Sequence, residues 1–170
     1  MNINIRTLIT TLLLIIVQAF LDNYIDLGLY TRIVITPYII INLPYKRGSV
    51  VTMIYAFLIG LAMDILSGGV MGLNAGALLA ASLIRQKILH TIINDYSMRN
   101  HEGPEFAVFG YRKSIFYISS IVLVYFVCYT YLSNFSFHPF GGNLLKIVIG
   151  TLLNTLIILM LFKKLNTERL

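Results

Sequence analysis

The sequence contains no tryptophan, one cysteine and only 12% charged residues. A single cysteine, Cys128, excludes an intrachain disulfide and a cysteine metal cluster, and we interpret it as a packing residue. A soluble domain carries about 25% charged residues, so this chain lacks the charge to cover a water-exposed surface. Since 58% of its 170 residues are hydrophobic and its mean hydropathy is +0.81, we predict one all-α domain embedded in a membrane.

Apolar segments predict six transmembrane helices, although some are shorter than the roughly 20 residues that an untilted span needs. The expected spans are residues 7–21, 27–43, 49–66, 69–84, 114–132 and 144–162. The second is the weakest, because Pro37 removes a backbone donor and should kink or interrupt a helix. A five-span alternative, with this segment re-entrant, remains open.

Basic residues predict the orientation. With a cytoplasmic N-terminus and six spans, eleven fall inside, namely Arg6, Lys46, Arg47, Arg85, Lys87, Arg99, Arg112, Lys113, Lys163, Lys164 and Arg169. Only Arg32 and Lys146 fall outside. The positive-inside rule therefore predicts cytoplasmic N- and C-termini. We expect the first span to be retained rather than cleaved as a signal peptide, because no small-residue cleavage site follows it.

The one sizeable loop, residues 85–113, is expected on the cytoplasmic side. Its first half continues the fourth span as an apolar helical stripe that Arg85 and Lys87 flank. Such a basic amphipathic helix lies at the membrane surface or docks a partner helix. Arg85 and Lys87 are therefore candidate partner contacts.

No catalytic group of residues is apparent in the sequence. None of the three histidines, His90, His101 and His138, has a second histidine or an acidic partner at i+3 or i+4 in an expected helix, and neither a Walker loop nor a Gly-x-Ser-x-Gly elbow is present. Asp22 and Asp26 follow the first span directly, where we expect water to solvate them. We predict a protein without enzymatic activity, cofactor or metal, and consider an intramembrane enzyme a third, remote class.

Asp64 is the one acidic residue close to hydrocarbon, and a glycine-rich turn follows it. Two stripes of small residues four apart, Ala56–Gly60 and Gly72–Gly76–Ala80, predict a tight helical hairpin. Asp64 then needs a hydrogen-bond partner, for which Asn74, the Ser67 hydroxyl or the free amides of the next helix are available. It could cap the hairpin or contact a ligand or partner. In the last span, Asn154 with Thr151 and Thr155 is expected to join helices.

The run Gly60-Leu61-x-x-Asp64-Ile65-Leu66-Ser67-Gly68-Gly69, which continues to Gly72-Leu73, resembles the MreD family of bacterial rod-shape proteins. Chain length, the basic C-terminus and Pro37 agree with this resemblance. It implies a membrane scaffold in the bacterial cytoplasmic membrane that binds MreC, and through it or directly MreB and the RodA–PBP2 peptidoglycan synthase. It also implies a fold similar to the six-helix substrate-binding subunits of energy-coupling-factor transporters.

That fold similarity supplies the main alternative, a small-solute (vitamin) binding subunit of such a transporter. Those subunits often dock through alanines four apart on the first helix, whereas the first span here holds a single alanine. The predicted outer loops also lack the polar, tryptophan-rich residues typical of a vitamin pocket. We therefore favour the scaffold interpretation.

Overall fold

The structure is a computed structural model, and it describes residues 5–25, 28, 31–44, 48–92, 106–135 and 140–167. Within them the fold is all-helical, as predicted, and its six helices are α1 (Ile5–Tyr24), α2 (Pro37–Ile41), α3 (Ser49–Leu66), α4 (Leu73–Ile92), α6 (Phe106–Asn134) and α7 (Phe140–Thr167). The predictions for Asp26, Lys46, Arg47, residues 93–105 and His138 lie outside the described residues.

Three helical stretches of the described chain are long and apolar enough to cross a membrane: Ser49–Leu66, Gly110–Asn134 and Phe140–Lys164. The stretch Leu8–Tyr24 of α1 is apolar but shorter. Within α6 the backbone breaks at Gly110, whose φ of 70° lies in the region that glycine tolerates, so the long apolar part of this helix begins there.

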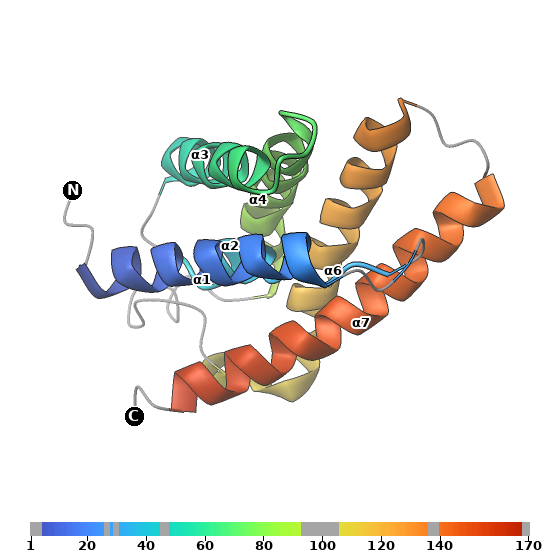
Figure 1. The fold of residues 1–170 in the computed structure, drawn as a ribbon. Coiled ribbons are helices and arrows are strands. Elements are labelled where there is room, and N and C mark those ends of the chain that lie inside the picture. Colours follow the sequence, from blue (N-terminus) through green and yellow to red (C-terminus); the bar gives the residue numbers. More distant parts are fainter. Residues whose placement is uncertain are drawn as a thin grey trace.

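Helices α3, α4, α6 and α7 pack in the order of the chain, whereas α2 packs against α4 and α6 (Figure 1). The α3–α4 hairpin packs through α4 against α6, and α6 packs against α7. Helix α1 lies beside α3 and in front of α2, and the start of α1 and the end of α7 lie on the same side of the view. The core is built around α6, whose Tyr117, Ile118, Ile121 and Tyr125 are fully buried.

The predicted second transmembrane helix is wrong. Residues 31–36 are not helical, and only the five residues of α2 are. Pro37 lies at the start of α2, where a missing N–H leaves no helical hydrogen bond unmade, so it starts a helix rather than kinking one. We call residues 31–43 the inner segment, because Val34, Ile40 and Ile41 are all at most 1% exposed.

The inner segment runs along the bundle. At one end Arg32 contacts Asp22 near the end of α1, and at the other Arg85 donates a hydrogen bond to the carbonyl oxygen of Leu43. Arg85 lies twelve residues into α4, which is about 18 Å along a helix. The segment therefore covers much of the length of α4, although only its residues 37–41 are helical.

The outer faces of α1 and α7 are apolar. The exposed side chains of α1 include Leu8, Ile9, Leu12, Leu13, Ile16 and Phe20. Those of α7 include Leu144, Leu145, Val148, Leu152, Leu156 and Met160. The buried face of α1 instead carries Thr11 and Gln18 beside Leu14. Polar side chains inside and apolar side chains outside are the arrangement expected of helices that face lipid.

Candidate functional site

Asp64 caps the following helix. Its side chain is 2% exposed, in the last turn of α3. The backbone N–H groups of Gly72 and Ala75 donate to Oδ2 at 2.8 and 3.3 Å, and that of Asn74 donates to Oδ1 at 3.0 Å. The carboxylate thus satisfies the free amides of the first turn of α4, at the end where the helix dipole favours a negative charge.

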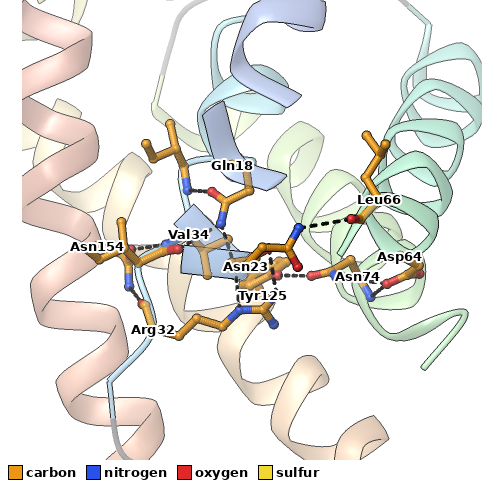
Figure 2. A network of polar contacts seen from close by, with 12 residues as sticks. Gln18, Asn23, Arg32, Val34, Asp64, Leu66, Asn74, Tyr125 and Asn154 are labelled. Carbon is orange, nitrogen blue, oxygen red and sulfur yellow. Dashed lines mark hydrogen bonds and ion pairs between the residues drawn. The ribbon is translucent and has the colours of Figure 1, made fainter. Parts of the chain in front are cut away.

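Asn74 extends this cap to α6. Its Nδ2 donates to Oδ1 of Asp64 at 2.9 Å, and its Oδ1 accepts a hydrogen bond from the Tyr125 hydroxyl at 2.6 Å. All three side chains are buried, and they link α3, α4 and α6 in one chain of hydrogen bonds (Figure 2). Of the partners expected for Asp64, Asn74 and the amides are used. The Ser67 hydroxyl makes no bond to it in the described part of the chain.

The glycines of the hairpin have different functions from those expected. The close approach of α3 to α4 occurs at Gly60, where a Cβ atom would overlap the backbone of Asn74 and Ala75. A Cβ on Gly76 would instead come within 2.7 Å of the Leu132 side chain on α6. Gly72 has no heavy atom near its Cβ position, but its φ of +97° requires glycine. The prediction that Gly72 and Gly76 pack α4 against α3 is therefore wrong.

The other two glycines of the α3–α4 turn, Gly68 and Gly69, have free space at their Cβ positions. Gly68 has a φ of +62° and nothing within 4 Å of its Cβ position, so it serves the turn conformation. Gly69 would place a Cβ at an ordinary 3.6 Å from the Ser67 hydroxyl oxygen. Neither glycine is required by close helix packing.

A second set of buried polar side chains holds the inner segment (Figure 2). Asn154 of α7 accepts the N–H of Val34 at 2.6 Å and donates to the carbonyl oxygen of Arg32 at 2.7 Å. Gln18 of α1 accepts the N–H of Ile35 and donates to the carbonyl oxygen of Ile33 at 2.9 Å. Two amide side chains on opposite sides thus replace the neighbouring backbone that a helix or sheet would supply.

Asn154 joins elements as predicted, but its partner is this extended backbone and the carbonyl of Gly150 in its own helix. The hydroxyls of Thr151 and Thr155 are buried without a hydrogen-bond partner in the described structure. They therefore add nothing to the junction that Asn154 makes.

Arg85 holds the far end of the inner segment. It is 1% exposed, and besides the Leu43 carbonyl it donates from Nε to the Tyr117 hydroxyl at 3.1 Å. That hydroxyl in turn donates to the carbonyl oxygen of Ile41 at 3.1 Å. The prediction of a surface contact at Arg85 is therefore wrong, because its guanidinium is used inside the bundle. Lys87 is exposed, as a surface role requires.

The same correction applies to the helical stripe around Arg85. Leu89 is buried at 3% exposure, and Ile88 and Ile92 pack against the core. The end of α4, as far as Ile92, thus packs against the bundle.

Asp22 pairs with Arg32 and does not face water. Arg32 donates from Nε and Nη2 to the two carboxylate oxygens at 3.1 and 2.9 Å, and only 6% of the Asp22 side chain is exposed. The guanidinium carbon lies 4.8 Å from the centre of the Tyr129 ring, a cation–π contact. The expectation of a solvated Asp22 is therefore wrong.

The ion pair and the hairpin cap line one pocket of about 200 Å³. Its walls are formed by Asp22, Arg32, Asp64, Ser67, Gly69, Val70, Leu73, Asn74 and Tyr129. Among the described residues, no three His, Cys, Asp or Glu side chains lie together as a metal site would need. The pocket is partly open, lies between α1, the α3–α4 turn and α6, and has both polar and apolar walls.

Three further residues of the site, Gln18, Tyr117 and Tyr125, were not predicted from the sequence. Gln18 is a polar residue inside an otherwise apolar helix, and that was the available signal. No such signal marks the tyrosines, because tyrosine is common throughout this chain, which has eleven.

Comparison of the chain with protein-family models, with curated proteins and with solved structures gives no match.

Proposed function

We propose that the protein is a non-enzymatic scaffold subunit of the bacterial cell-elongation complex, of the MreD type. The observation that carries this proposal is that the buried polar groups and the exposed apolar faces have separate roles. The buried polar side chains Asp64, Gln18, Asn154 and Arg85 all bind the backbone of their own chain. The exposed faces of α1, α3 and α7 are rich in apolar side chains, which suit other transmembrane helices.

In this proposal the chain spans the bacterial cytoplasmic membrane six times. The inner segment makes the second crossing in a largely non-helical form, which a bilayer tolerates only where protein surrounds the backbone. Both termini are cytoplasmic, in agreement with the distribution of basic residues and with α1 and α7 beginning and ending on one side (Figure 1). MreC is the proposed direct partner, and MreB and the RodA–PBP2 synthase are reached directly or through it.

Co-purification tests the proposal. The full chain, tagged and extracted in mild detergent, should bring down MreC, and Leu152→Trp on the exposed face of α7 or Leu12→Trp on that of α1 should reduce the recovery. Each variant should keep the wild-type thermal midpoint, since neither position packs inside the chain. Depletion should turn rod-shaped cells round. Recovery of no elongation protein, with cell shape intact after depletion, would refute the scaffold function.

The alternative, a solute-binding subunit of an energy-coupling-factor type transporter, has one observation in its favour, the pocket beside Asp64. Its 200 Å³ is below the roughly 300–1,000 Å³ of pockets that enclose drug-sized ligands, so a vitamin does not fit as it stands. Recovery of an ATPase module, with loss of solute uptake on depletion, would support this alternative.

A further inference from the structure

The pocket between α1, the α3–α4 turn and α6 contains hydrogen-bond donors that the fold does not use. Asp64 already accepts four hydrogen bonds from Gly72 and α4, and Asp22 accepts three from Gln18 and Arg32. Both carboxylates are therefore largely saturated, and little acceptor capacity is left on the walls.

Several hydrogen-bond donors of the pocket, in contrast, have no partner among the described residues. Arg32 uses Nε and Nη2 for Asp22, so its Nη1 makes no hydrogen bond in the described structure. The hydroxyls of Ser67 and Tyr129 line the same pocket and likewise make none among the described residues. A guanidinium nitrogen and two hydroxyls around one small pocket form a set of donors from which phosphate oxygens accept hydrogen bonds.

The charges around the pocket permit an anion to bind there. The charge of Asp22 is balanced by Arg32, and that of Asp64 faces the positive end of α4. The cation of the ion pair is the more accessible partner, since 29% of the Arg32 side chain is exposed against 6% of that of Asp22. An incoming anion therefore meets Arg32 before either carboxylate.

We propose that this pocket binds a phosphate group, carried either by a phospholipid headgroup or by a free phosphate ester. The rim favours the lipid. Val70 is a wall residue that is 69% exposed, and its neighbours Leu66 and Met71 are 49% and 69% exposed. Acyl chains would cover these apolar side chains while the phosphate meets Arg32, Ser67 and Tyr129.

Ligand binding to the purified full chain tests the proposal. Dioleoylphosphatidylglycerol should bind, as measured by native mass spectrometry and by a raised thermal midpoint, whereas dioleoylglycerol, which lacks the phosphate, should bind at least tenfold more weakly. Equal binding of the two would overturn the proposal. sn-Glycerol 3-phosphate is the third probe. If it raises the midpoint and the lipid does not, phosphate recognition stands and the source is a soluble ester.

Variants locate the site. The double variant Ser67→Ala, Tyr129→Phe removes both hydroxyls and keeps the aromatic ring under Arg32, and it should weaken binding about tenfold or more. The matched control Ser119→Ala, Tyr24→Phe removes the same groups at a half-buried and an exposed position outside the pocket and should bind as wild type.

A second pair guards against a folding defect in the first. At the exposed rim, Val70→Glu should weaken phosphate binding, because it adds a like charge, while Val70→Gln should not. Wild-type binding by both the double variant and Val70→Glu would show that the phosphate does not enter this pocket.

Discussion

The α3–α4 hairpin and the inner segment solve the same problem, that of satisfying backbone groups away from water, in opposite ways. In the hairpin both segments are regular helices, whose backbone groups mostly bond one another. Only the free N–H groups at the start of α4 need an acceptor, and the carboxylate of Asp64 in α3 accepts their hydrogen bonds. In the inner segment part of the backbone of residues 35–43 is hydrogen-bonded within the segment, and other backbone groups need partners from elsewhere. Side chains from α1, α4, α6 and α7 supply them.

This difference changes what each region requires of its sequence. The hairpin depends on the absence of a side chain at Gly60, because the two backbones meet there. The inner segment depends on the presence of particular amide and guanidinium groups at positions far apart in the chain. Loss of space should therefore damage the first region, and loss of hydrogen bonds the second.

The largest effect is expected from Gly60→Val, which puts a branched side chain against the backbone of α4. Because backbone cannot move aside as a side chain can, we expect the loss of more than about 3 kcal/mol of stability. The thermal midpoint in detergent measures it. Gly76→Val is the matched control, since it meets only the flexible end of Leu132 and should cost far less. Equal losses would contradict the assignment of the close contact to Gly60.

Asn154→Leu tests the inner segment in the same assay. It leaves the N–H of Val34 and the carbonyl of Arg32 without partners, and we expect about 2–3 kcal/mol of destabilisation. Cysteine accessibility at Thr36, in a Cys128→Ser background, should rise because the segment loosens. An unchanged midpoint together with an unchanged labelling rate would show that α7 does not hold the segment.

Asp64→Asn is expected to have a smaller effect, about 1–2 kcal/mol. The variant keeps the shape and one acceptor oxygen, but it removes the charge at the start of α4 and turns an NH₂ group toward amide donors. Asp64→Ala, which removes all acceptors, should be clearly worse when thermal midpoints are compared. If Asn and Ala were equally tolerated, the capping role would be wrong.

Thr155→Val should change stability by no more than about 0.5 kcal/mol or raise it slightly, because its buried hydroxyl has no partner in the described structure and valine has nearly the same shape. It is the polarity control for Asn154→Leu on the adjacent position of α7. A loss as large as that of Asn154→Leu would mean that polarity in general, rather than the Asn154 hydrogen bonds, is what α7 contributes.

The sequence predicts the hairpin well and the inner segment poorly, for a physical reason. The partners of Asp64 lie within eleven residues of it, so local spacing already brings the carboxylate to the start of α4. Pro37 correctly marks an interruption of the second apolar segment. It does not reveal what replaces the helix, because Val34 and its partner Asn154 are separated by 120 residues.

Arg85 shows the same limit of prediction from local sequence patterns. A basic residue at the edge of an apolar stripe is normally a surface residue, and only the position of the Leu43 carbonyl and the Tyr117 hydroxyl makes burial favourable here. Polar residues inside apolar helices, such as Gln18 and Asn154, are the part of the sequence from which an irregular buried backbone could have been anticipated.

The separation between Val34 and Asn154 also bears on how the chain is made. Synthesis proceeds from the N-terminus, so residues 31–43 leave the ribosome long before α7 does. Until then the N–H of Val34 and the carbonyl of Arg32 lack the partner that they have in the finished protein. Helix α7 therefore completes a segment that is synthesised well before it, and the inner segment has all of its partners only after α7 has been made.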